Sequence, residues 1–180
     1  NGWWMCLIPT DVVREIGLSL PVFIKWDDAE YGLRAGNAGY PTVTLPGAGV
    51  WHVSWGEKDD LVGWQAFFHE RNRLIAALLH SPYERGGRLV KESHFMDIKH
   101  IISMQYYTQT GRLMAQRDVL AGPDHLHDTI GTDLPEIRAL AAKFDDAVQK
   151  KDVDDFPAVR TNRPPRKGRG FSQPRRLLMP

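Results

Sequence analysis

Apolar residues recur at helical spacing through the middle of the chain. Within residues 61–79 they fall on one stripe of a helix. Ser93 is a suitable N-cap for a second helix, which we expect to run to about residue 113 with Gly111 as a break. A third helix is predicted over residues 133–148, because an acid and a proline stand in its first turn. The middle of the chain is therefore expected to be helical.

The first part of the chain has a different pattern. Residues 18–26 (LSLPVFIKW) are apolar and rich in residues that favour strands. Residues 28–35 suit two helical turns, and residues 41–45 and 50–53 suit two short strands separated by a Pro-Gly turn. Because strand, helix and strand follow one another, we expect an α/β sheet here.

Charge and composition divide the chain further. Seven basic residues and no acidic ones stand in 157–180, which is also rich in proline, so we expect a basic, extended or disordered tail. The segment before it is mildly acidic. We therefore predict three parts: residues 1–56 as the end of an α/β domain, 57–156 as a helical region, and 157–180 as the tail.

Overall composition excludes some classes of protein. Hydrophobic residues make up 42% of the chain and charged residues 25%, as in globular proteins, and no apolar run reaches the ~20 residues that span a bilayer. Cys6 is the single cysteine, so no internal disulfide can form. All six tryptophans lie at or before Trp64, and the chain starts without methionine, so we expect a piece of a longer protein.

The densest polar cluster follows the first predicted strand. Asp27, Asp28 and Glu30 stand where a strand would end and a helix begin, the place where open α/β sheets bind ligands. Adjacent carboxylates there can supply a general base and hold a substrate hydroxyl. The alternative is structural, because acids are also common as caps and in the first turn of helices.

A histidine and several tryptophans accompany these acids. His52 ends the last predicted strand and can ligate a divalent metal if carboxylates join it, although a lone histidine among apolar residues is more often structural. Indole faces suit the apolar face of a sugar ring, and we favour Trp4 and Trp55 for such a role over core filling.

Other polar residues carry less information. His69 lies on the predicted helix 61–79, where its position favours a solvent-facing side chain over one that reaches the cleft. His125 and His127 point to different sides of a helix, which argues against a shared metal. The basic tail lacks the interleaved aromatic residues of a nucleic-acid module, so we expect no nucleic-acid partner.

Together these segments resemble a known family. The run Phe23–Arg34 (FIKWDDAEYGLR), followed by glycines, resembles the acidic motif of inverting GT-A glycosyltransferases. With Asn1-Gly2-Trp3-Trp4 before it and Trp51–Gly56 (WHVSWG) after it, the wording is similar to the polymerising galactofuranosyltransferases of mycobacterial-type cell walls. The resemblance runs to about Arg160. It implies the C-terminal portion of a Rossmann-like GT-A domain, followed by a helical domain.

The resemblance also implies roles for single residues. Asp28 matches the general base, and Asp27 matches an acid that helps hold the acceptor. His52 matches a ligand of Mn²⁺ or Mg²⁺, which would stabilise the leaving diphosphate of UDP-galactofuranose. The acceptor, a lipid-linked galactan, would also meet Trp4, Trp55, His69 and Glu30.

One departure limits what the chain can do alone. The Asp-x-Asp motif of the family is absent from residues 1–56, and Asp152-Val153-Asp154 lies in a polar segment that we interpret as solvated. We therefore expect the isolated 180 residues to be inactive.

The same residues are also compatible with other functions. The alternatives to galactofuranosyl transfer are a GT-A transferase with another sugar donor and a non-catalytic carbohydrate-binding or assembly module. The resemblance implies a cytoplasmic enzyme, peripheral at the inner face of the plasma membrane. The apolar surface of the helical region suggests a homo-oligomer.

Overall fold

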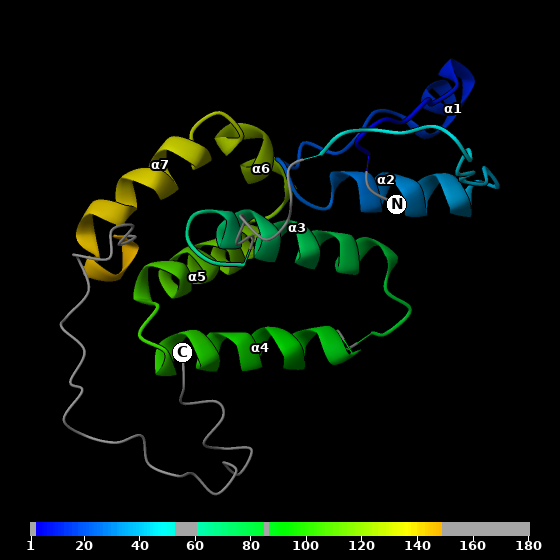
Figure 1. Cartoon of the computed structure of the whole chain (residues 1–180). Helices are drawn as coiled ribbons and strands as arrows, with labels where there is room; N and C mark the ends of the chain where they lie inside the picture. Colours follow the sequence, from blue (N-terminus) through cyan, green and yellow to red (C-terminus); the bar gives the residue numbers. More distant parts are fainter. Residues whose placement is uncertain (1–2, 53–60, 85–86, 149–180) are drawn as a thin grey trace, which may run out of the picture.

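The computed structural model describes residues 3–52, 61–84 and 87–148, and within these ranges it contains helices and no strand. Figure 1 shows the helices along the chain. They are α1 (Thr10–Ile16), α2 (Asp27–Asn37), α3 (Gln65–His80), α4 (Gly87–Ile102), α5 (Tyr106–Ala121), α6 (Pro123–Thr129) and α7 (Asp133–Leu140), followed by the 3-10 turns Ala141–Lys143 and Asp145–Ala147. None of the described helices is long and apolar enough to cross a membrane.

The apolar core lies where α3, α5 and α7 meet. Phe67 and Phe68 of α3, Ala115 of α5 and Ile137 of α7 are almost fully buried there. Gly111 of α5 permits this packing, because a Cβ at that position would stand 3.1 Å from the Ile137 Cδ1 atom. Helices α3 and α5 make the most extensive contact among the described helices. They therefore form the centre against which the other helices pack.

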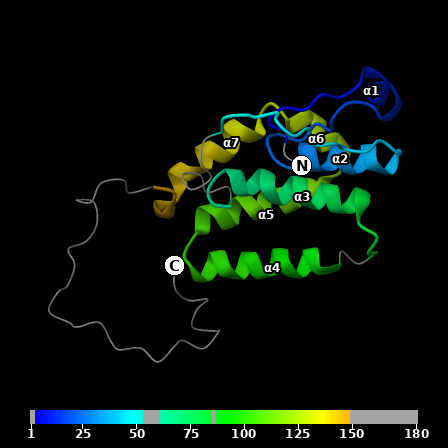
Figure 2. The same ribbon diagram turned by 45° about the vertical axis from the view of Figure 1, so that its right-hand side comes forward.

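Helix α4 is joined to this support largely by polar contacts. Its Ser93 and Asp97 bond Arg112 of α5, with Arg112 Nε lying 2.7 Å from Asp97 Oδ1. Arg112 also pairs with the buried Glu70 of α3 at 2.9 Å. Figure 2 shows α4 alongside α3 and α5 at the edge of the bundle. Buried charges of both signs satisfy one another here, as they must where water is excluded.

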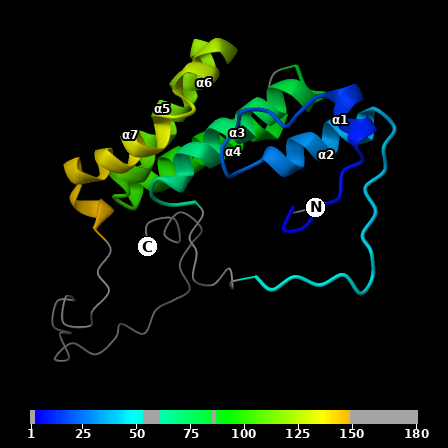
Figure 3. The same cartoon turned by 90° about the horizontal axis from the view of Figure 1, so that it is seen from above.

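Helix α2 lies against the opposite side of α3. Figure 3, a view from above, shows α2 running beside α3, with α1 near its far end. The connection before α2 is fastened to α3 by Phe23, whose ring meets that of Phe68 edge-on at 5.0 Å between centroids. This packing places the N-terminus of α2 over α3.

The strand predictions are wrong wherever the structure describes them. Residues 18–26, 41–45 and 50–52 form turns and irregular backbone, and residue 53 lies outside the described ranges. A strand needs the hydrogen bonds of a neighbouring strand, and none of the described residues supplies one. Phe23 and Trp26 of this segment instead contact rings on α3, and Leu18 is exposed, so the described residues do not confirm an α/β fold.

Most of the predicted helices are present, but several of their ends differ from the prediction. The predicted helices at 28–35 and 61–79 are confirmed as α2 and α3. The predicted helix 93–113 is instead two helices, which separate at residues 103–105, and Gly111 lies inside α5. The helix from Asp133 ends at Leu140 instead of 148. The two predicted domain boundaries fall in residues 53–60 and 149–180, outside the described ranges.

Candidate active site

The predicted acids lie at the start of α2, after a backbone turn in an uncommon conformation. Ile24 and Trp26 both have positive φ, of 63° and 67°. The left-handed region is unfavourable for side chains with a Cβ, above all for a branched one such as isoleucine. Between them, the Lys25 N–H donates to the Phe23 carbonyl at 2.8 Å, which closes a tight turn. This turn sets the direction in which α2 begins.

Asp27 and Asp28 occupy the first turn of α2, but neither is its N-cap. That position belongs to Trp26, whose side chain makes no capping hydrogen bond. The Asp28 carboxylate accepts from the Ala29 N–H at 2.7 Å and from the Trp3 N–H at 3.3 Å. Both acids are partly exposed and border one hollow. Asp28 thus satisfies an N–H of the first helical turn, as the structural alternative expects, and its carboxylate also borders the hollow.

The hollow beside the acids has a volume of about 510 Å³. Aromatic side chains, both acids and a histidine form most of its wall. Its lining residues are Trp3, Trp4, Ile24, Lys25, Trp26, Asp27, Asp28, Ala29, Leu61 and His69. Carboxylates for hydroxyl groups and indoles for ring faces are what a sugar requires of its binding site.

Edge-on aromatic contacts bring the other predicted residues to this place. The Trp4 ring meets His52 at 5.5 Å, and the Trp26 ring meets His69 at 5.9 Å. Trp3 packs on Tyr31 of α2 at 5.2 Å. The structure thus brings Trp4, Trp26 and His69 to the wall of one hollow, with His52 beside Trp4.

His69 stands on α3 and lines the same hollow as the two acids. Burial lowers the pKa of its imidazole, and the nearby positive charge of Arg73 lowers it further. The side chain is therefore favoured in its neutral form at neutral pH, in which one ring nitrogen donates a hydrogen bond and the other accepts.

Glu30 faces away from this hollow. Its side chain is buried, and both carboxylate oxygens accept from Arg34 at 3.1 Å, while His80 Nε2 lies 3.0 Å from Oε1. Arg34 in turn donates to the carbonyls of Ile16 and Leu18. The structure gives Glu30 a place in the packing of α2 against α1 and α3, and it is not among the described residues that line the hollow.

The described residues do not by themselves form a metal site. No group of three His, Cys, Asp or Glu side chains within them is placed to hold an ion. His52 is exposed and lies beside Trp4. His125 instead pairs with Asp118 at 3.2 Å. The predicted metal role of His52 stays a prediction, and Trp55 lies outside the described residues.

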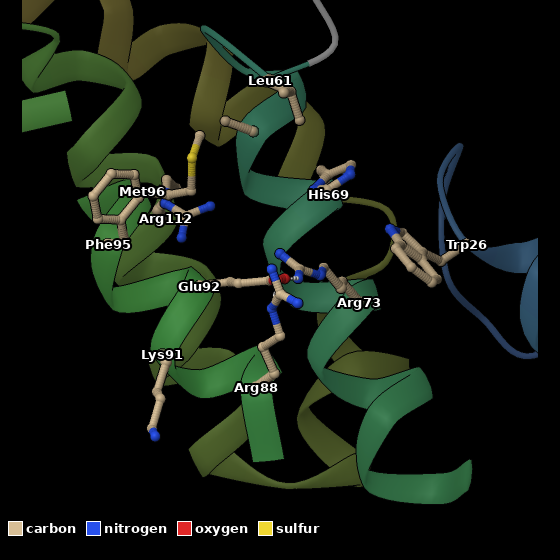
Figure 4. Close-up of a pocket in the computed structure, with 11 residues that line it drawn as sticks. Trp26, Leu61, His69, Arg73, Arg88, Lys91, Glu92, Phe95, Met96 and Arg112 are labelled. Carbon is tan, nitrogen blue, oxygen red and sulfur yellow. Dashed lines mark hydrogen bonds and ion pairs between the residues drawn. The ribbon is translucent and has the colours of Figure 1, made fainter. Parts of the chain in front are cut away.

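A larger cavity of about 710 Å³ adjoins the first. Trp26, Leu61 and His69 line both. Figure 4 shows Trp26 and His69 on one side of it and Phe95 and Met96 of α4 on the other. Glu92 accepts a hydrogen bond from Arg73 at 2.7 Å and pairs with Arg88 at 2.7 Å, and Lys91 lines the cavity as well, so cationic side chains outnumber the single carboxylate there.

Sequence reasoning missed two residues of the site. The sequence gives Trp26 no role apart from its place in the acidic motif, whereas in the structure it lines both hollows. The Trp3 backbone N–H donates to Asp28. The position of Trp26, directly before paired acids, was the available indication. Nothing in the sequence indicated that the Trp3 backbone approaches Asp28, because the two are 25 residues apart.

Comparison with known proteins places these observations in a family. Residues 89–177 match the family described as Galactofuranosyltransferase-2, domain 3. The galactofuranosyltransferase GlfT2 of Mycolicibacterium smegmatis is 50% identical over 149 residues, which is 82% of this chain and 23% of that protein. GlfT2 of Mycobacterium tuberculosis is 45% identical over 159 residues, 87% of this chain and 25% of that protein. The chain thus spans about a quarter of the length of these relatives.

Proposed function

Because the chain belongs to the galactofuranosyltransferase GlfT2 family, we propose that it forms the acceptor side of the active site of a galactofuranosyltransferase. The chain would contribute the end of a GT-A catalytic domain and the helical region that supports it. The donor would be UDP-galactofuranose, and the acceptor a growing, lipid-linked galactan of the cell wall.

The observation that carries this proposal is the position of Asp28. Its carboxylate borders an open hollow whose walls are aromatic, and it is held by two backbone N–H groups. A general base has to reach the hydroxyl from which it takes a proton, and a partly exposed carboxylate that borders an open hollow meets that requirement. The relatives named galactofuranosyltransferase support the choice of sugar.

The proposed reaction is a single displacement with inversion. The Asp28 carboxylate takes the proton of an acceptor hydroxyl as that oxygen attacks the anomeric carbon of galactofuranose. The new glycosidic bond forms while the bond to the diphosphate breaks, and UDP leaves with the electron pair. Asp27 would hold a neighbouring acceptor hydroxyl, and Trp4 and Trp26 would provide faces for its ring.

The adjoining cavity gives the rest of the acceptor a place. A polymerising enzyme holds several sugars behind the one that reacts. The cavity between α3 and α4 meets the Asp28 hollow at Trp26 and His69, so a chain that reaches Asp28 could continue along Phe95 and Met96. His69, neutral and facing both spaces, would bind acceptor hydroxyls as donor and acceptor.

The experiment that tests this function measures donor preference. The complete enzyme is given a galactan acceptor with UDP-galactofuranose, UDP-galactopyranose or UDP-glucose, and the products are identified by mass spectrometry. Transfer from UDP-galactofuranose alone is the expected result. Equal or preferential use of another donor would establish a different GT-A transferase, and acceptor binding without any transfer would establish a binding module.

Three further expectations belong to this proposal. A divalent metal, Mn²⁺ or Mg²⁺, would have His52 as one ligand, with the others supplied from outside the described residues. The enzyme would be a homo-oligomer and peripheral at the cytoplasmic face of the plasma membrane, and the basic tail 157–180, outside the described residues, would contribute to that attachment. The 180 residues alone would be inactive.

A further inference from the structure

We propose that Asn72 is a positioning residue for the acceptor-side acids, acting through the turn that precedes α2. This inference rests on the proposed function, because the turn matters for catalysis only if Asp28 is the base. Asn72 stands in the middle of α3 and is 1% exposed. It does not line the hollow, so any influence on the reaction has to pass through the backbone that it holds.

The contacts of Asn72 are directed at that backbone. Its Nδ2 donates to the Phe23 carbonyl at 3.0 Å and to the Lys25 carbonyl at 2.8 Å. These carbonyls flank Ile24, whose φ of 63° is the less favourable of the two positive values because its side chain is branched at Cβ. Both N–H groups of one amide therefore hold the two ends of the strained residue.

The orientation of the amide is fixed from the other side. Arg71 Nε donates to Asn72 Oδ1 at 3.3 Å, which directs the NH₂ group toward the turn. Arg71 is itself buried and paired with Asp133 at the start of α7, and its guanidinium lies over the Phe67 ring at 4.9 Å. Asn72, which holds the turn, is thus connected through Arg71 to the core of the helical region.

The two acids follow the clamped turn directly in the sequence. Lys25 is held by Asn72, Trp26 has a φ of 67°, and Asp27 and Asp28 are the next two residues, in the first turn of α2. A turn that relaxes to negative φ at Ile24 would redirect the chain that enters α2. Displacements of about 1 Å at a reacting group cost roughly a hundredfold in rate, so the clamp has a catalytic consequence.

The test compares Asn72→Ala and the milder Asn72→Ser with Gln116→Ala in the complete enzyme. Gln116 is a matched control, because its Nε2 also makes two cross-helix hydrogen bonds, to Glu70 at 3.2 Å and Asp97 at 3.1 Å, but none to the turn. Hydrogen–deuterium exchange of the peptide over residues 20–30 reports the turn itself. We expect faster exchange there in both Asn72 variants and not in Gln116→Ala.

Kinetics then connect the turn with Asp28. At a temperature well below unfolding, Asn72→Ala should lower kcat at least tenfold, with a smaller loss for Asn72→Ser and less than twofold for Gln116→Ala. In an Asp28→Asn background, Asn72→Ala should lower the residual rate by less than twofold. The base is already absent from this background, so a change in its position has no further effect on the rate.

The outcomes separate the two proposals. Unchanged exchange over residues 20–30, or an equal loss of kcat with and without Asp28, overturns the positioning role and leaves the proposed function standing. Faster exchange together with normal turnover of Asp28→Asn shows that the clamp holds a turn without catalytic importance, which overturns both the role of Asp28 and the inference that depends on it.

Discussion

At the scale of single residues, neighbours in sequence have quite different tasks. Asp28 and Glu30 are two positions apart in the first turns of α2, yet one carboxylate borders the hollow and the other is buried against Arg34 and His80. Residues two apart on a helix point to different sides. The sequence predicts Asp28 as the base and Asp27 and Glu30 as acceptor-binding residues of one acidic motif, whereas in the structure only Asp27 and Asp28 of these three line the hollow.

The buried position of Glu30 leads to a prediction. Glu30→Gln should destabilise the protein by about 2 kcal/mol, because it removes the charge that Arg34 and His80 meet. It should leave the KM for acceptor within twofold. Thermal unfolding and acceptor titration measure the two effects, with Asp27→Asn as the comparison that should show the opposite pattern. A raised KM for acceptor without a change in stability would contradict this prediction and would indicate that Glu30 binds the acceptor.

At the scale of elements, the sequence predicted helices better than strands. The helices α2, α3 and α7 were foreseen, because their apolar spacing and first-turn residues are local properties. The break between α4 and α5 was misplaced, because it depends on Met104 at a φ of 58°, a residue with no turn propensity. The strands were wrong because residues 18–26 are apolar for another reason, namely their packing on α3 through Phe23.

The separation of α3 from α4 by a cavity gives a prediction about acceptor length. Phe95 lines this cavity and is 47% exposed, so Phe95→Ala removes binding surface without disturbing the core. We expect its KM to rise several-fold for long galactan acceptors and to stay unchanged for a disaccharide acceptor, because only the long acceptor reaches beyond Trp26. Initial rates with the two acceptors provide the measurement.

An equal change for both acceptors would contradict this use of the cavity. Leu120→Ala is a suitable control, because Leu120 is an exposed apolar residue on α5 and does not line the cavity. Its KM values should match those of the wild type for both lengths of acceptor.

At the scale of the whole molecule, buried polar side chains join the helices and make their packing sensitive to pH. Burial lowers the pKa of His100 at the end of α4, and the charge of Arg112 on α5 lowers it further, partly offset by Asp97. The pKa of His69 on α3 is lowered too, chiefly by burial. Both imidazoles therefore bind a proton less readily in the folded protein than in the unfolded chain.

This difference fixes the sign of the pH dependence. Because the unfolded chain takes up protons near its ordinary pKa of about 6.5, stability should be fully present above that pH and fall as the pH drops below it. Hydrogen exchange of α4 and α5 in the intact protein, corrected for intrinsic rates at pH 7.5 and 5.5, measures this. His100→Gln should show a smaller acid-induced loss of protection than wild type. An equal loss would contradict the contribution of His100.

The measurement that tests the account most directly is galactofuranose transfer by the complete enzyme carrying Asp28→Asn. This substitution keeps the size of the side chain and its place in the hollow, and removes the base. We predict that kcat falls roughly a hundredfold or more, the range of a positioned general base, with UDP-galactofuranose binding and the fold retained. Near-normal turnover would contradict the account, because it would leave Asp28 without a catalytic role in the hollow that α2 and α3 form.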